Sequence, residues 1–224
     1  MSLSTDSGAV ADAAAPVDET PKKRDFTFRV AWLAAVLILG LLLGAGGALY
    51  AGRNVHPGDT SPEAGFLRDM STHHAQAVEM AMIAHAGSTN DQIISLAADI
   101  ALTQHGQIGY MQAWLRDWSL SPTGSRPPMS WMPDSAGAVV NGLMPGMATP
   151  EQLTRLRAAT GTALDVQFLT LMRRHHLGGI HMAQAVLDQS DNKDVTWLAG
   201  TMVISQQGEL HLIDFLLKQL QAAS

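Results

Sequence analysis

The feature of this sequence that most constrains its fold is an internal repeat. His73 and His74 recur 102 positions later as His175 and His176, and each pair lies within the same Met-x-x-His-His pattern. The match continues without a gap into a second segment of each repeat. A match across two helical segments and the turn between them indicates that a whole helical hairpin was duplicated. Two such hairpins pack naturally as a four-helix bundle with one long connection between them.

Helix start and stop signals divide the part of the chain that holds the repeat. Ser61-Pro62-Glu63 predicts an N-cap followed by proline at the first helical position, and Thr149-Pro150-Glu151-Gln152 predicts a capping box. We expect helices over residues 61–86, 91–118, 149–189 and 193–220, the third of them broken near Gly161. No segment alternates like a strand, so the predicted fold class is all-α.

A transmembrane helix is predicted before the repeat. The run from Val30 to Ala51 carries no charge and has the length needed to span ~30 Å of hydrocarbon. Four basic residues precede this run and only Arg53 follows closely, so the positive-inside rule places the N-terminus in the cytoplasm. We therefore expect a single-pass protein of the cell membrane with an extracytoplasmic C-terminal domain. A cleaved signal peptide is the alternative, although its apolar core is typically only ~7–15 residues long.

These patterns give a complete division of the chain. The segments are a disordered cytoplasmic tail (1–29), the transmembrane helix (30–51), a linker (52–60) and the helical domain (61–222). The helical domain consists of repeats 61–118 and 163–220, which the connection 119–149 joins.

The composition excludes several classes of function. The chain has no cysteine, which excludes disulfides, thiolate zinc sites and cysteine nucleophiles. A formal net charge of −6 provides no basic surface for nucleic acid. No pattern of nucleophile and base, phosphate loop or cofactor fingerprint stands out, so we expect a binding protein rather than an enzyme.

The histidine pairs and the nearby methionines share one face of each predicted helix, since their spacings return to the same side of a helix. Apolar neighbours on that face indicate that it points into the bundle. These candidate metal ligands are Met70, His73, His74, Met80, Met172, His175, His176 and Met182. Glu79 and His181 project from the far side, so we exclude them.

Two further groups of residues belong to the predicted site. Met144-Pro145-Gly146-Met147 places two thioethers in a turn, where core packing gives less reason for methionine, so Met144 and Met147 are candidate ligands as well. The partner helices carry polar residues that could accept a hydrogen bond from a metal-bound imidazole. These residues are Gln104, Gln107, Gln206 and Glu209.

Copper is the metal that this ligand set favours. Imidazole and thioether together suit Cu(I), and imidazole alone also suits Cu(II), whereas zinc gains little from methionine. Calcium and magnesium prefer oxygen ligands, and neither repeat has the Glu-x-x-His pattern of a carboxylate di-iron centre. Core histidines that only bond Gln104, Gln206 and nearby carbonyls are the alternative.

On these residues the chain resembles the domain-of-unknown-function family 305. The two His-His segments, the Met144–Met147 turn and the run from Glu151 to Ala183 carry the resemblance, which covers roughly residues 61–220. It implies a ferritin-like four-helix bundle, export from the cytoplasm and, for some members, copper binding and tolerance. It also implicates the same histidines and methionines. Gln107 and the pair Gly178-Gly179 depart from the family's usual pattern.

The expected function is therefore copper binding outside the cytoplasm by a membrane-anchored protein. Such a protein would buffer the metal or exchange it with a donor or acceptor protein. A structural or protein-interaction bundle without catalysis is the first alternative, and a metal-dependent redox enzyme is the second.

Overall fold

In the computed structural model, which describes residues 22–51 and 56–222, every regular element is a helix. The helices are α1 (Lys22–Ala51), α2 (Pro62–Gly87), α3 (Asp91–Asp117), α4 (Pro150–Ala158), α5 (Gly161–Leu187) and α6 (Lys193–Ala222). The predicted all-α class is thus confirmed. The chain divides into two compact units, residues 1–55 and 56–224.

The first unit contains α1, which is long and apolar enough to cross a membrane. Its segment Thr27–Tyr50 has a mean hydropathy of 2.2, a composition that fits either a membrane span or a signal sequence. The sequence predicts that residues 22–29 belong to a disordered tail, but the helix begins at Lys22 and these residues are helical. No glycine or proline lies between residues 22 and 29, and the helix therefore continues into the basic flank. The rest of the predicted tail, residues 1–21, lies outside the described residues.

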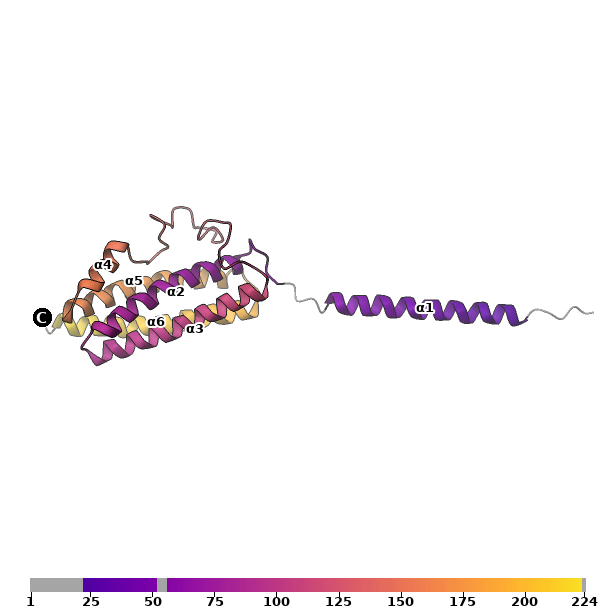
Figure 1. Cartoon of the computed structure of the whole chain (residues 1–224), viewed down its shortest axis with the longest axis horizontal. Coiled ribbons are helices and arrows are strands. Elements are labelled where there is room, and N and C mark those ends of the chain that lie inside the picture. Colours follow the sequence, from indigo (N-terminus) through magenta and orange to yellow (C-terminus); the bar gives the residue numbers. More distant parts are fainter. Residues whose placement is uncertain (1–21, 52–55, 223–224) are drawn as a thin grey trace, which may run out of the picture. The chain divides into compact units, whose positions relative to one another are not determined.

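The second unit is a bundle of four long helices that lie side by side (Figure 1). Helix α2 packs against α3 and α5, and α5 packs against α6, so α2 and α5 form the central pair. The short helix α4 lies against α2 and α5. The predicted break near Gly161 is present, because Ala159 and Thr160 separate α4 from α5.

The predicted helix caps are present. The Ser61 side chain accepts a hydrogen bond from the Ala64 backbone amide at 3.2 Å. Thr149 and Gln152 form both hydrogen bonds of a capping box at the start of α4. Each cap satisfies backbone amides that have no partner within the helix.

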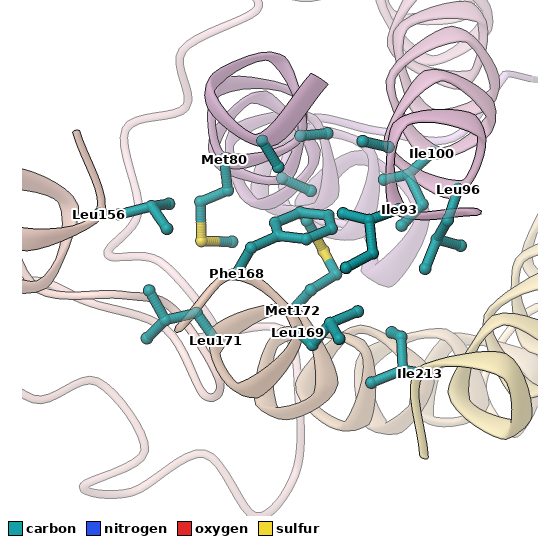
Figure 2. Close-up of a cluster of buried hydrophobic side chains, with 14 of the residues drawn as sticks. Met80, Ile93, Leu96, Ile100, Leu156, Phe168, Leu169, Leu171, Met172 and Ile213 are labelled. Carbon is teal, nitrogen blue, oxygen red and sulfur yellow. The ribbon is translucent and has the colours of Figure 1, made fainter. Parts of the chain in front are cut away.

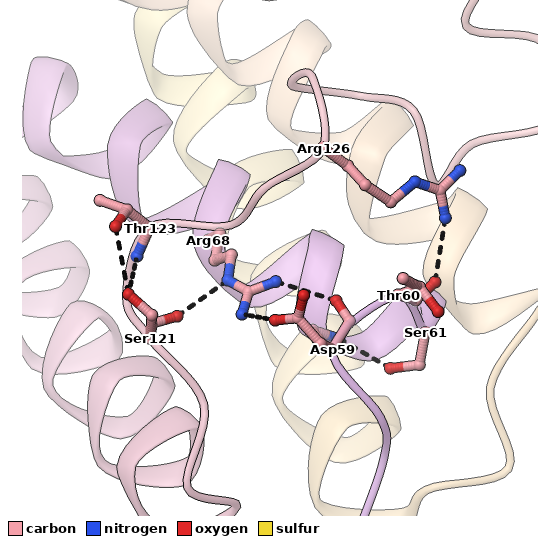
Figure 3. Close-up of polar contacts among 8 residues, drawn as sticks. Asp59, Thr60, Ser61, Arg68, Ser121, Thr123 and Arg126 are labelled. Carbon is pink, nitrogen blue, oxygen red and sulfur yellow. Dashed lines mark hydrogen bonds and ion pairs between the residues drawn. The ribbon is translucent and has the colours of Figure 1, made fainter.

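The first part of the connection is fastened to the start of α2 by arginine side chains (Figure 3). Arg68 donates to the Ser121 carbonyl at 2.9 Å and to the Asp59 carboxylate at 2.5 Å. Arg126 donates to the Thr60 carbonyl at 3.2 Å. These contacts hold the residues before α2 and the residues after α3 together.

Two hydrophobic clusters fill the bundle, one toward each end. The cluster in Figure 2 includes Phe168, Met80 and Ile100 and lies where α2 and α3 meet at their turn. The second includes Phe66, Met111 and Met182 and lies toward the start of α2. Between the clusters every long helix carries buried polar residues, and this layer contains the candidate site.

Candidate metal centre

A layer of polar side chains crosses the bundle between the two hydrophobic clusters. Helix α2 contributes His73 and His74, and α5 contributes His175 and His176; each of these side chains is at most 1% exposed. Helices α3 and α6 contribute the four polar residues of the prediction. These are Gln104, Gln107, Gln206 and Glu209. The structure thus brings together both histidine pairs, which lie far apart in the sequence.

The two pairs form one cluster because α2 and α5 cross at the histidines. The ring centroids of His73 and His175 are 3.8 Å apart, with 36° between the ring planes. Met70 lies in the same hydrophobic cluster as Met182, and Met80 in the same cluster as Met172. This pairing shows that the two helices run antiparallel about the histidine layer.

His73, His74 and His176 each use Nε2 to hold another part of the protein. His73 Nε2 donates to the Pro145 carbonyl at 3.0 Å, and His74 Nε2 donates to Gln107 Oε1 at 2.7 Å. His176 Nε2 donates to the Glu209 carboxylate. A carbonyl oxygen only accepts hydrogen bonds, so in the neutral rings of His73 and His74 Nδ1 carries the lone pair.

The remaining nitrogens have no hydrogen-bond partner. They are Nδ1 of His73, His74 and His176, and Nε2 of His175, all of them buried. A buried polar atom without a partner costs about 1–3 kcal/mol. Four such atoms in one layer are more than an ordinary core tolerates, whereas a metal ion would use their lone pairs.

Burial keeps three of these imidazoles neutral, those of His73, His74 and His175. It lowers the pKa of His73 from 6.5 to about 4 and the pKa of His74 to about 3, and it lowers the pKa of His175 well below 6.5. The neighbouring histidines lower each of these pKa values further, since a second positive charge in the layer would be repelled. Neutral rings offer a lone pair to a metal without first losing a proton.

The layer is not preorganised around a metal position. Within residues 22–51 and 56–222, no three or more His, Asp or Glu side chains are placed so that they could hold an ion together. The four free nitrogens nevertheless fit the donor set of a copper ion by their chemistry. Binding would then require ring rotation or additional ligands.

The predicted methionine ligands are divided between the two sides of the histidine layer. Met80 and Met172 belong to the cluster of Figure 2, whereas Met70, Met144 and Met182 belong to the other, and Met147 packs against that second cluster. Every one of these methionines except Met147 is at most 5% exposed. Thioethers therefore flank the histidines above and below along the bundle axis.

The turn Met144–Met147 lies directly on the histidine layer. Its Pro145 carbonyl holds His73, and Gly146, with φ of 84°, approaches the α5 backbone so closely that a Cβ would lie 2.5 Å from the Arg174 carbonyl. A Cβ on Gly178 would overlap the Pro145 carbonyl. The absence of a side chain at Gly178 is therefore what lets the turn reach α5.

Sequence reasoning missed the residues that fasten this turn. The Gln76 side-chain amide donates to the Ala148 carbonyl at 3.0 Å and accepts from the Ala148 amide at 2.6 Å. Arg174 donates to the Met147 carbonyl at 3.1 Å. Both residues lie within two positions of a histidine pair in the sequence. This proximity to the candidate ligands could have identified them as part of the site.

Asp69 was also missed. Its carboxylate accepts from the Met129 amide at 2.7 Å and from Trp131 Nε1 at 2.8 Å, which ties the connection to α2. Burial raises the pKa of Asp69, and the two hydrogen bonds partly offset that shift. The signal was a carboxylate on an otherwise apolar helix face, at the position where the second repeat has Leu171.

Two expected hydrogen bonds are absent among the described residues. Neither Gln104 nor Gln206 bonds a histidine; Gln104 Oε1 has no partner, and Gln206 packs against Gly179. Of the four predicted polar residues, Gln107 and Glu209 accept from an imidazole, each at a separation of 33 residues from its histidine. The remaining histidines are exposed: His56, His85, His105, His181 and His211.

Comparisons with known proteins agree with this fold. The model of the domain of unknown function DUF305 matches residues 63–217. The crystal structure of a DUF305 protein from Streptomyces coelicolor is 40% identical with a TM-score of 0.67, and the match covers 73% of this chain and 96% of that one. A DUF305 fragment from Deinococcus radiodurans is 32% identical with a TM-score of 0.59, over 70% of this chain and 96% of that one.

More distant structures share the fold alone. CopM in its Cu(I)-bound form is 21% identical with a TM-score of 0.54, over 71% of this chain and 96% of CopM. CopM in its Cu(II)-bound form gives a TM-score of 0.55 at 21% identity, over 74% of this chain and 99% of CopM. No protein of curated function matches the chain.

Proposed function

The chain belongs to the DUF305 family, and from that premise we propose that it binds copper outside the cytoplasm through its buried histidine layer. In this proposal α1 anchors the protein in the membrane, and the bundle buffers copper or exchanges it with a donor or acceptor protein. The observation that carries the proposal is the set of four buried imidazole nitrogens, one on each histidine, without a partner.

The ligand chemistry supports copper over other metals. His73, His74, His175 and His176 would supply the nitrogen ligands, and the flanking methionines would add thioethers, which favour Cu(I). Imidazole alone accepts Cu(II) as well, while zinc gains nothing from the thioethers. CopM, which shares the fold, has been obtained with Cu(I), Cu(II) and Ag. Soft monovalent ions in that relative agree with a site rich in histidine and methionine.

Other residues of the layer would orient the ligands. Gln107 and Glu209 fix which nitrogen of His74 and of His176 is free, which is the usual role of a hydrogen-bonding partner behind a metal ligand. Met144 and Met147 stand at the turn that covers the layer and would supply thioethers from outside the helices. The same turn separates the histidines from solvent.

The proposed location is supported by α1 and its flanks. The span has no charge, and the basic residues stand on its N-terminal side, which favours a cytoplasmic N-terminus and an extracytoplasmic bundle. An oxidising compartment also agrees with a copper site that uses no cysteine.

Anaerobic titration of the purified full chain with Cu(I) against a competing chelator tests the proposal. Replacing His73, His74, His175 and His176 together by alanine should abolish high-affinity binding. The chain offers a matched control, since alanine at the exposed His85, His105, His181 and His211 changes the same number of imidazoles and should leave the affinity unchanged. If the quadruple variant fails to fold, His176→Gln alone replaces it as the test, and this single variant should weaken binding. Equal affinity in the wild type and the variants of the buried histidines would refute the site.

A structural role is the competing function, and one observation favours it. Three of the histidines already hold the protein together by hydrogen bonds, and no metal position is preformed in the described residues. A purely structural layer predicts that Cu(I) leaves the melting temperature of the full chain unchanged. A copper site predicts a rise that grows with the Cu(I) concentration, because the metal binds the folded state only.

A further inference from the structure

The tryptophans and the tyrosine of the bundle gather at one of its two ends, whereas Phe168 and Phe215 lie toward the other. All four tryptophans of the bundle lie toward the end where α2 and α6 begin and α3 and α5 finish; they are Trp114, Trp118, Trp131 and Trp197. Ser190 Oγ donates to Glu63 Oε1 at 2.7 Å, which shows that the turn between α5 and α6 meets the start of α2. The opposite end has no tryptophan or tyrosine among the described residues.

Several of these rings form a connected, exposed band. Tyr110 contacts Trp114 at a ring distance of 5.9 Å and Trp197 at 6.1 Å, which joins α3 to α6. Tyr110 is 52% exposed and Trp197 is 55% exposed. His56 stacks on Trp118 at 6.4 Å. Burial in the core does not explain rings that remain half in solvent, and none of them belongs to the histidine layer.

The chain itself ties this end of the bundle to the predicted membrane span. The apolar segment of α1 ends at Tyr50, and only residues 52–55 separate Ala51 from His56. A fully extended chain gains at most ~3.6 Å per residue, so this tether reaches at most ~18 Å. His56 contacts Trp118, so the chain that follows the predicted span enters the bundle at its aromatic end.

We infer that the aromatic end of the bundle docks on the headgroup layer of the membrane that α1 crosses. Tryptophan and tyrosine combine an apolar ring with a polar group, and both are enriched at membrane–water interfaces for that reason. Tyr110 lies seven residues before the last residue of α3, about 10 Å along the helix, which matches the shallow depth of interfacial insertion. This inference depends on the anchoring part of the proposed function and not on copper.

Charge at this end selects the kind of lipid surface. The exposed acids outnumber the exposed bases here; the acids are Asp59, Asp117, Asp134, Asp188, Asp191 and Asp194, and the bases are Arg116, Arg126 and Lys193. Attachment to anionic lipid usually depends on clusters of Lys and Arg, and no such cluster is present here. The surface therefore fits zwitterionic phospholipid, held by its rings rather than by charge.

Site-directed spin labelling of the full chain in phosphatidylcholine nanodiscs tests this docking. The chain has no cysteine, so single substitutions are labelled at one position only. Lys193→Cys reports the aromatic end, and Lys218→Cys is the matched control, an exposed lysine near the other end of the same helix. The label at position 193 should show several-fold lower access to an aqueous nickel chelate than the label at 218. Anionic phosphatidylglycerol should not be needed for this protection.

A second variant separates docking from other causes of protection. Tyr110→Gln together with Trp197→Gln, both at exposed positions, should restore access at position 193 to the level at 218 while Cu(I) affinity stays unchanged. Equal access at 193 and 218 in the wild type would overturn the inference. Protection that appears only in discs holding two chains would also overturn it, because a second copy would then cover the band. A chain that does not enter the discs would refute the anchor on which the inference depends.

Discussion

The two hairpins hold their matching histidines, His74 and His176, with different chemical groups. In the first hairpin the neutral amide of Gln107 accepts from His74, and in the second the carboxylate of Glu209 accepts from His176. A carboxylate behind an imidazole makes the opposite ring nitrogen a stronger donor than an amide does. Positions that match in sequence and geometry therefore differ in ligand strength. We therefore expect the second hairpin to be the half of the layer that binds a metal more strongly.

The hairpins also differ in how the connection covers them. Gln76 on α2 clamps the Ala148 backbone, whereas the matching position on α5 is Gly178, which lets the Pro145 carbonyl pass. The connection therefore contacts α2 through hydrogen bonds to its backbone and contacts α5 through close backbone packing. Matching residues on α2 and α5 have different roles, and the histidine layer is chemically asymmetric even though its histidines are paired.

Acid should produce the largest change, and two of the three histidines whose pKa burial lowers lie in the first hairpin. The folded-state pKa values of His73 and His74, about 4 and about 3, lie below the 6.5 of an unfolded histidine. Between these values the unfolded chain binds more protons, so the stability is complete above pH 6.5 and falls as the pH drops toward 4. The expected loss is on the order of 1 kcal/mol per pH unit for each histidine. Thermal unfolding of the metal-free full chain between pH 7 and 4 measures it.

His74→Phe identifies the source of that acid loss. The variant should show a shallower fall of melting temperature with pH, whereas His105→Phe, at an exposed position, should keep the wild-type slope. An unchanged slope in His74→Phe would mean that the buried imidazoles of the first hairpin are not what acid protonates.

Exchanging the two hydrogen-bond acceptors should give the next largest effect. Glu209→Gln gives both hairpins an amide and should weaken Cu(I) binding by about 10–100-fold, the usual range for a group that orients a metal ligand. Gln107→Glu gives both a carboxylate and should strengthen binding. Chelator competition measures both affinities. If Glu209→Gln left the affinity at the wild-type value, the proposed inequality of the two halves would be lost.

The fold and the candidate ligands followed from sequence because periodicity and capping are local signals. The caps at Ser61 and Thr149 and the break at Gly161 all depend on residues close together in the chain. The inward face of each histidine pair followed from helical spacing in the same way. The sequence also placed Gln107 among the residues that could accept a hydrogen bond from an imidazole, since it lies at the edge of the inward face of α3.

Contacts between distant segments could not be predicted in this way. Nothing in the residues around Pro145 shows that its carbonyl meets His73, 72 positions earlier. The sequence also treated Met70 and Met80 as one ligand group, but ten residues of helix separate them by about 15 Å, and they lie in different hydrophobic clusters. Helical spacing identifies a common face and does not identify a common depth.

Gly178→Ala tests the asymmetric cover and should have a smaller effect. The added Cβ would overlap the Pro145 carbonyl, and the turn outside the helices would have to shift. We expect a loss of about 1 kcal/mol in stability, since overpacking is partly relieved by movement of the turn. The His73 hydrogen bond should break, which its imidazole NMR shifts would reveal. Unchanged shifts together with unchanged stability would show that α5 does not need glycine there.

The smallest effects are expected where the hairpins are alike. Gly106 and Gly208 occupy matching positions on α3 and α6, both helical and exposed, and a Cβ on either would meet nothing within 4 Å. Alanine at each should therefore stabilise the bundle by about 0.4–1 kcal/mol, because it reduces the freedom of the unfolded chain. Equal gains in chemical denaturation would place the difference between the hairpins in the histidine layer and its cover. Unequal gains would show that the asymmetry extends to the outer surfaces of α3 and α6.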